Sequence, residues 1–300
     1  MRIRTILIVA ASLGAACASS RAGTDAGRVS VVANFYPVYE AARRVGGDRV
    51  HVRNLTPAGA EPHDLELSPK QVDEVLDARV VLYMGLGFQP AVEKVAEERG
   101  STHTVDLLAA LSSRLRRLPK GGEEQGTDPH VWLDPVLMNA LVDEVTRALT
   151  RADPAGRSTY EANARRYGAQ IEEVDLLYRQ GLADCDRRVI VTAHAAFGYL
   201  AARYGLVQEP ITGISPEAEP DPRRLAELAA LVRREGVTTI FTEELVSPRV
   251  ADTLAREAGV RTAVLNPLEG LSPSELAHGE NYVSVMNQNL AMLRAALGCR

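Results

Sequence analysis

Residues 153–181, DPAGRSTYEANARRYGAQIEEVDLLYRQG, decide the fold. Asp153-Pro154 is a helix-start pattern, because an Asp N-cap and a proline at the first helical position both suit a helix N-terminus. Apolar residues then recur in steps of four and three at Tyr160, Ala164, Tyr167, Ile171, Val174 and Tyr178. This period indicates one buried stripe on a helix. With no breaker before Gly181, we expect a rigid helix of about 27 residues, on the order of 40 Å long.

Short β-branched segments alternate with helical patterns on both sides of this helix. We expect strands at residues 30–36, 50–55, 79–85, 103–108, 188–194, 237–243 and 261–266, and helices at 38–45, 68–77, 195–204, 223–235 and 250–258. Such alternation is typical of parallel sheets covered by helices. The sequence therefore predicts an α/β protein with two lobes, each built on a mainly parallel sheet, joined by the long helix. The predicted boundaries are 28–150 for the N-terminal lobe, 153–183 for the linking helix and 186–300 for the C-terminal lobe.

The N-terminus has the form of an export signal. Two Arg precede an apolar run from Ile6 to Ala16, which is too short to span a membrane. We therefore expect residues 1–16 to be a signal peptide and Cys17 to be lipidated, with simple cleavage nearby as the alternative because Gly14 departs from the usual lipoprotein pattern. Residues 17–27 are small and polar and read as a flexible tether. The protein is expected in the periplasm or on the outer cell surface, held to the membrane by its N-terminal lipid.

The composition of the remaining chain excludes some partners. The net charge is −5, or −7 after loss of Arg2 and Arg4, and the chain holds no Lys/Arg block, so we expect no nucleic-acid partner. We expect a monomer. If Cys17 carries lipid, Cys185 and Cys299 are left, and two leftover cysteines in an exported protein most simply form a disulfide.

Three of the six histidines occupy the same kind of position. His63 follows a strand in a Pro/Gly-rich loop, His130 lies in DPHVWLDP just ahead of a helix that starts at Asp134-Pro135, and His194 ends a strand. In open α/β sheets ligands bind beyond the carboxyl ends of the strands. Three imidazoles converging there predict a zinc-type site. We expect structural or surface roles for the other three histidines, His51, His103 and His278.

Six segments together resemble one protein family. These are GAEPHDLELSPKQV (59–72), DPHVWLDP (128–135), VTAHAAFGYLAARYGL (191–206), GISPEAEPDP (213–222), IFTEELVSPRVADTLAREAG (240–259) and VLNPLEGL (264–271). In this order they are similar to the metal-binding solute-binding proteins of ABC transporters, the cluster A-I family that serves zinc and manganese uptake. The resemblance extends over nearly all of the chain after the signal.

The resemblance implies a metal site in the cleft between the lobes. It assigns ligand roles to His63, His130 and His194. Manganese members usually have Glu at the third position, so His194 favours zinc, with Mn²⁺ as the second choice. The implied function is high-affinity zinc binding outside the cytoplasm and delivery to an ABC permease with its cytoplasmic ATPase.

The fourth ligand departs from one common family pattern. Many members offer Asp where this chain has Asn266, and a neutral amide is a poor zinc ligand beside three neutral imidazoles. Glu269 can supply the missing carboxylate, and we expect it to be the fourth ligand, with Glu243, Glu61 or water as alternatives. Glu243 has a competing role as the acceptor that orients a ligating histidine. Residues 117–127 also lack the His-rich tract that many zinc members carry there.

Three other functions stay open from the sequence. One is a manganese-binding homologue, and another is a surface adhesin or zinc buffer that uses the same fold without a permease. A zinc hydrolase needs an open coordination position and a general base, and the sequence has neither HExxH nor GxSxG. We therefore do not expect an enzyme. Because imidazole must be neutral to ligate and its reference pKa is about 6.5, binding should fail below about pH 6.

Overall fold

Two four-stranded parallel sheets carry the two halves of the chain in the computed structural model, which describes residues 27–116 and 127–300. The first sheet has the order β2-β1-β3-β4 and the second the order β6-β5-β7-β8. The strands are β1 (Val29–Ala33), β2 (Val50–Asn54), β3 (Val80–Tyr83), β4 (Thr104–Asp106), β5 (Val189–Thr192), β6 (Val207–Pro210), β7 (Thr239–Thr242) and β8 (Arg261–Val264). In both sheets the strand order reverses beside the first strand, which is where ligands bind in such folds.

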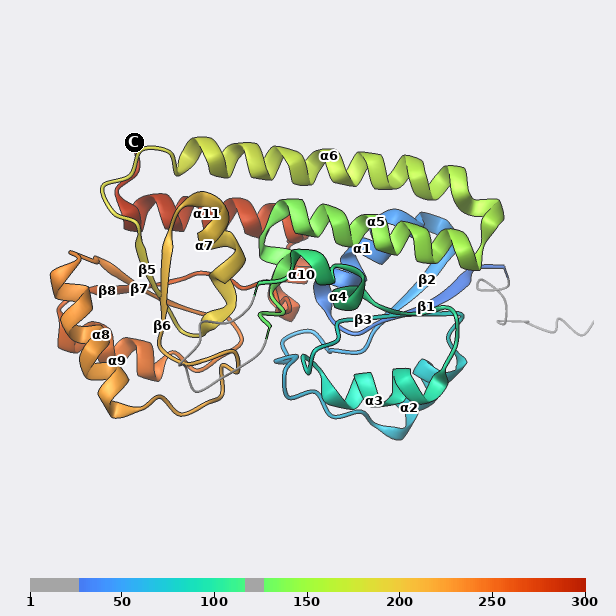
Figure 1. The fold of residues 1–300 in the computed structure, drawn as a ribbon, viewed down its shortest axis with the longest axis horizontal. Coiled ribbons are helices and arrows are strands. Elements are labelled where there is room, and N and C mark those ends of the chain that lie inside the picture. Colours follow the sequence, from blue (N-terminus) through green and yellow to red (C-terminus); the bar gives the residue numbers. More distant parts are fainter. Residues whose placement is uncertain (1–26, 117–126) are drawn as a thin grey trace, which may run out of the picture.

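Helices cover both faces of the N-terminal sheet. Helices α1 (Tyr36–Gly46) and α5 (Pro135–Ala152) lie on one face, and α2 (Pro69–Asp77) and α3 (Pro90–Arg99) lie on the other (Figure 1). The alternation of side chains along β1 shows why: Val31 belongs to the core under α1 and α5, whereas Val32 belongs to the core under α2 and α3. A short helix, α4 (Leu107–Ala110), follows β4.

The C-terminal sheet is covered in the same way. Helices α7 (Gly198–Tyr204) and α11 (Tyr282–Leu297) lie on one face, and α8 (Pro222–Arg234) and α9 (Arg249–Ala258) on the other (Figure 1). Along β5, Ile190 packs into the first core and Val191 into the second. The remaining elements are short: α10 (Pro273–Ala277) and 3₁₀ turns at Gly47–Arg49, Ser112–Arg114, Val131–Leu133, Pro154–Gly156 and Ala195–Phe197.

Helix α6 (Arg157–Gly181) joins the two halves along one side of the molecule (Figure 1). It follows a single 3₁₀ turn at Pro154–Gly156, and five of its six predicted stripe residues are at most 2% exposed (Tyr160, Tyr167, Ile171, Val174 and Tyr178). The buried core beneath it continues from the N-terminal sheet to the C-terminal sheet without a break. The predicted fold, two parallel α/β lobes joined by one long helix, is confirmed.

Some elements differ from the sequence prediction. The strand expected at residues 103–108 stops at Asp106, because this residue caps α4: its side chain accepts a hydrogen bond from the Ala109 backbone N–H. Strand β6 was not predicted, since VQEP is a short and polar edge strand. Helices α3, α10 and α11 were also not predicted, although an Asn281 capping box marks the start of α11.

The C-terminal end of the linking helix is tied to the end of the chain. Cys185, just beyond α6, forms a disulfide with Cys299, just beyond α11. Inside the same region the Tyr178 hydroxyl donates to the Met286 carbonyl at 2.7 Å, which joins α6 to α11. The predicted signal peptide, the lipidation site Cys17 and most of the tether lie outside the described residues. Within the described ranges, none of the helices has the length and apolar content that crossing a bilayer requires.

The disulfide should stabilise the fold strongly. It spans 114 residues of sequence, and the chain-entropy model credits a loop of that size with about 5 kcal/mol, before any native-state strain. We expect the double substitution Cys185→Ser, Cys299→Ser to lower the free energy of unfolding in urea by up to that amount. Wild-type protein treated with dithiothreitol is the control and should lose the same stability. Two reactive thiols in the denatured, unreduced wild type would contradict the pairing.

Candidate metal centre

The loop that carries His63 is held to the sheet by a buried amide. Gln89, at the start of α3, donates to the Pro62 carbonyl at 2.9 Å and to Thr56 Oγ1 at 3.0 Å, and accepts from Asn34 Nδ2 at 2.7 Å. Gln89 is fully buried, so each of these bonds must be kept to avoid an unsatisfied polar group. The residue before His63 is thereby fixed in place.

His130 is oriented by the residue two positions before it. Asp128 Oδ1 accepts from the His130 backbone N–H at 2.9 Å and lies 2.8 Å from its Nδ1. His130 then caps a 3₁₀ turn, and Asp134 begins α5 by accepting from the Val136 N–H. The Asp-Pro pairs of DPHVWLDP thus act as predicted, the first on the loop and the second as a helix start. The direct bond of Asp128 to the imidazole was not predicted, although the Asp-x-His spacing indicates it.

His194 follows β5 and is oriented from the neighbouring strand. Glu243, the first residue after β7, places Oε1 at 2.7 Å from His194 Nδ1 and 3.1 Å from its backbone nitrogen. Both residues are buried. This is the orienting position that the sequence analysis gave to Glu243 as its second possible role.

The loop after β8 brings Glu269 into the site through a shaped turn. Leu268 adopts a left-handed conformation (φ 58°), a costly one for a side chain with a Cβ. Asn266 supports it, because its Oδ1 accepts from the Leu268 N–H at 2.8 Å while its Nδ2 donates to Glu275 at 3.0 Å. The Asn266 side chain is therefore used by the loop and is not part of the cluster. An Asp there would face the Glu275 carboxylate.

The four side chains expected to bind metal come together. His63, His130, His194 and Glu269 each offer one ligand atom, and these atoms lie within 4.8 Å of one another. Glu269 Oε1 is the centre of the group, at 3.3, 3.0 and 3.1 Å from the Nε2 atoms of the three histidines in that order. His130, His194 and Glu269 are buried, and His63 is partly buried, with its side chain 8% exposed.

These distances match the edges of a coordination shell. Zinc bonds of about 2.0–2.1 Å to nitrogen and oxygen give neighbouring ligand atoms in a tetrahedron a separation of about 3.3 Å. His130 Nε2 lies 3.0 Å from the carboxylate, yet it is not aligned for a hydrogen bond with it and has no other partner among the described residues. A buried nitrogen in that state is available to a metal ion.

The orienting carboxylates also select the tautomer. With Nδ1–H directed at Asp128 in one ring and at Glu243 in the other, Nε2 of both rings faces the centre of the cluster. This carboxylate–histidine pairing is usual around metal sites, where it fixes the ring and raises the basicity of the ligand nitrogen. The arrangement is suited to a divalent ion that prefers imidazole.

Without metal, the cluster holds its charges by mutual attraction. Burial opposes protonation of His194, but the carboxylates of Glu243 and Glu269 outweigh it and hold the pKa of His194 well above its usual value. Burial likewise favours the neutral acid of Glu269, yet the three imidazoles, His194 foremost, hold the pKa of Glu269 well below its usual value. For His63, burial dominates and lowers the pKa.

Glu61 is a second acidic group beside the cluster. Its Oε1 accepts from the His63 backbone N–H at 2.7 Å, while its Oε2 is buried and has no hydrogen-bond partner among the described residues. Burial, with the charge of Glu269 next in importance, raises the pKa of Glu61 to about 8. Glu61 therefore stands as the neutral neighbour of a charged Glu269 at neutral pH.

The three other histidines lie away from the cluster. His51 is an exposed residue of β2, His103 precedes β4, and His278 follows α10, where its Nδ1 lies 2.8 Å from the Ser274 carbonyl. None of them is part of the metal-ligating group found among the described residues.

Known proteins are similar to this chain in fold and in sequence. The family model described as zinc-uptake complex component A, periplasmic, matches residues 31–296. The crystal structure of the Zn(II)-bound ZnuA-like domain of Streptococcus pneumoniae AdcA is similar with a TM-score of 0.77 and 40% sequence identity, covering 90% of this chain and 99% of that domain.

Two curated relatives carry the similarity further. The zinc-binding lipoprotein AdcA of Streptococcus pneumoniae is 40% identical over an alignment 280 residues long, which covers 89% of this chain and 56% of that protein. The chain thus spans little more than half the length of this relative. The high-affinity zinc uptake system protein ZnuA of Bacillus subtilis is 36% identical over an alignment 308 residues long with its gaps, which covers 98% of this chain and 96% of that protein.

Asp128 should matter to metal binding although it does not touch the metal position. Asp128→Ala removes the acceptor of His130 Nδ1–H, so the ring loses its orientation and a buried donor is left unpaired. We expect zinc affinity to fall by about 10- to 100-fold, the usual cost of such a loss, as measured by competition with a chromogenic chelator. Asp128→Asn keeps an acceptor and should lose less. The control is Asp221→Asn at the exposed start of α8, and an equal loss in that variant would contradict the role of Asp128.

Proposed function

The chain belongs to the family of periplasmic zinc-uptake complex A components, and on this premise we propose that it binds one Zn²⁺ outside the cytoplasm and delivers it to an ABC permease. His63, His130, His194 and Glu269 are the proposed ligands. The permease, driven by its cytoplasmic ATPase, is the proposed partner, and the proposed location is the outer side of the cytoplasmic membrane, with Cys17 as the lipid anchor.

The observation that carries the proposal is the convergence of three imidazole Nε2 atoms on one buried carboxylate oxygen. Three nitrogens and one oxygen, with nitrogen–oxygen distances close to the edge of a tetrahedral zinc shell, suit zinc, whereas manganese and magnesium prefer more oxygen ligands. The single carboxylate leaves a net charge of about 1+ on the loaded site, and the negative groups of Asp128 and Glu243 behind the imidazoles balance it.

The same coordination argues for a carrier and against a hydrolase. A catalytic zinc keeps an open position for the water that it activates. Four protein ligands would fill the tetrahedral shell here, so no coordination position would be left for such a water. The proposed chemistry is therefore binding and release of the ion without a reaction.

One zinc ion per chain is the expected stoichiometry, because the four ligands form a single cluster. Native mass spectrometry of protein purified without chelator should show the mass of one Zn²⁺. Glu269→Gln removes the only anion of the proposed shell, so we expect at least a tenfold loss of affinity, about 1.4 kcal/mol. Glu243→Gln keeps a hydrogen-bond acceptor for His194 and should cost less.

If the two losses of affinity came in the reverse order, the proposed roles of Glu269 and Glu243 would be exchanged. If Glu269→Gln binds zinc like the wild type while Glu243→Gln does not bind it, the anion of the shell is not Glu269. His194→Ala tests the histidines separately, and it should also abolish most of the rise in melting temperature that zinc causes, because that rise comes from binding to the folded state.

Zinc affinity should still depend on pH above about pH 6.5, the pKa of a free imidazole. Zinc must displace the proton of His194, whose pKa is raised by Glu243 and Glu269 against the effect of burial. Because a raised pKa keeps the proton on the ring above pH 6.5, affinity should still increase between pH 6.5 and pH 8 and should fall as the pH drops. Calorimetry at pH 7 in buffers of different ionisation enthalpy should detect proton release. An affinity that is constant across this range would contradict the prediction. The control is His278→Asn, which changes a histidine outside the cluster and should keep the wild-type pH dependence.

A further inference from the structure

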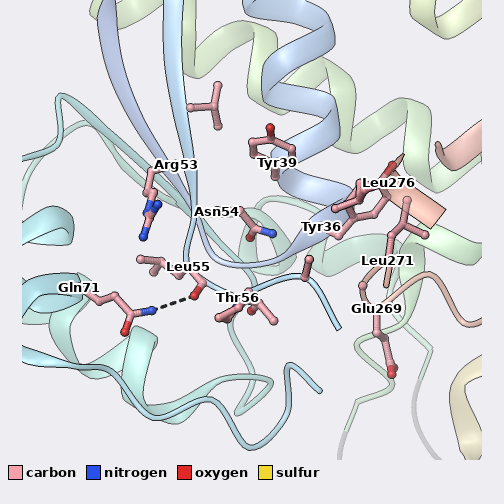
Figure 2. A pocket seen from close by; sticks show the side chains of 14 residues that line it. Tyr36, Tyr39, Arg53, Asn54, Leu55, Thr56, Gln71, Glu269, Leu271 and Leu276 are labelled. Atoms are coloured by element: carbon pink, nitrogen blue, oxygen red, sulfur yellow. Dashed lines mark hydrogen bonds between the residues drawn. The ribbon is translucent and has the colours of Figure 1, made fainter. Parts of the chain in front are cut away.

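A pocket of about 380 Å³ lies against the metal cluster on the side of β2. Its walls come from both lobes: Asn54, Thr56 and Ala58 belong to the N-terminal lobe, and Leu271 and Leu276 to the C-terminal lobe. Figure 2 shows Asn54 between these walls, with Tyr36, Leu271 and Leu276 on one side and Gln71 and Leu55 on the other. The pocket is thus an interlobe space that reaches the proposed metal site.

Glu269 belongs to both the pocket and the cluster. It lines the pocket together with Gly270 and Leu271, and it is the one proposed ligand that does so. In Figure 2 its carboxylate extends beyond Leu271, away from Tyr36 and Leu276. The exposed fraction of the lining residues falls from 44% at Leu276 to 1% at Glu269. The pocket therefore leads from the surface to one buried ligand.

The chemistry of the lining suits a hydrated cation. Asn54 lines the pocket with an amide side chain, whose Oδ1 has no hydrogen-bond partner among the described residues. Arg53, at the exposed side, places Nε at 3.1 Å from Glu74 Oε2, so a carboxylate balances its charge. A positive ion entering the pocket meets the carboxylate residue Glu269 at the inner end, and the one cationic side chain of the lining, Arg53, is paired.

The rest of the interlobe contact resists opening. Trp132 Nε1 donates to the Pro267 carbonyl at 2.8 Å, and the Tyr282 hydroxyl donates to the Trp132 carbonyl at the same distance. These residues belong to the core that continues through both lobes. Separating the lobes widely would break this core, whereas beside the pocket the only backbone bond between the lobes in the described chain is that of the Gly59 N–H to the Leu271 carbonyl at 3.0 Å.

We propose that this pocket is the route by which the metal ion reaches and leaves the buried histidines, with Glu269 as the first ligand that the hydrated ion meets. The inference rests on the proposed function, since it concerns the exchange of the same ion. The ion loses its water to Glu269 at the inner end of the pocket and then takes the three Nε2 atoms. Release follows the same path in reverse.

A route differs from a site in its kinetics. An obstacle on the route raises the same barrier for binding and release, so both rates fall by one factor and Kd stays unchanged. Ala58→Phe narrows the pocket at an exposed position, and Leu276→Ala widens it at its mouth. We expect Ala58→Phe to slow both rates by about tenfold, equal to about 1.4 kcal/mol of barrier, and Leu276→Ala to speed both.

The measurement uses the full chain and zinc. Trp132 is the only tryptophan, and its ring lies 5.1 Å from that of His130, so its fluorescence serves as the reporter in stopped-flow mixing with Zn²⁺ and, for release, with excess chelator. Two variants at positions outside the pocket are the matched controls: Ala110→Phe, exposed at the end of α4, and Leu176→Ala, 43% exposed on α6. Both should keep the wild-type rates.

The outcomes separate the two proposals. Wild-type rates in both pocket variants, or a changed Kd with only one rate altered, would overturn the route while leaving zinc binding intact. A wild type that binds no zinc would instead overturn the proposed function. If Ala58→Phe does not fold, as judged by circular dichroism, Leu276→Ala decides alone, because trimming an exposed leucine does not disturb the core.

Discussion

The structure depends on burying one carboxylate among three imidazoles. An ionised carboxylate that is taken out of water without compensation costs several kcal/mol, and Glu269 is 1% exposed. Its compensation comes from His63, His130 and His194, which follow different segments of both lobes. The lobes must therefore be held in one relative position, or the carboxylate loses its partners.

The frame that holds this position is the shared core below α6. A flexible linker would let the lobes diverge, but here the helix, α11 and the disulfide between Cys185 and Cys299 form one side of the molecule. Trp132 belongs to the same core and joins it to the loop of Glu269, because it donates to the Pro267 carbonyl and accepts from Tyr282 at the start of α11. The segment that carries His130 and the loop that carries Glu269 are in this way parts of one packed unit.

Much of this could be predicted from periodicity and position. The four-three spacing of α6 is a strong signal because it extends over several turns, and the loop histidines could be assigned because ligands in parallel α/β folds gather beyond strand ends. The hydrogen bonds to Nδ1 are harder to infer. Asp128 was interpreted only as part of an Asp-Pro pair, although the same side chain both shapes the loop and orients the ring. Strand β6 was missed because an edge strand of four residues needs no apolar pattern.

The role of Asn266 was only half predictable for a similar reason. Its neutral side chain excluded it as the anion of the site, but its bonds to Leu268 and Glu275 depend on a left-handed turn that the residue type alone does not indicate. Sequence reasoning therefore predicts where a side chain must carry charge more reliably than how a loop turns to present it.

The charge balance of the cluster explains how a buried site can exist both with and without its ion. The pKa values of His130 and His194 are raised, in both cases by carboxylates that outweigh burial. Protons on these two rings carry the same charge as one Zn²⁺, so exchanging two protons for the ion leaves the total charge around Glu269 unaltered. Asp128 and Glu243 then face a positive imidazole or a metal-bound one in the same geometry, and neither has to move. For the proposed ion, the carboxylates that orient the rings are in place in this structure, and protons on the imidazoles would compete with the metal.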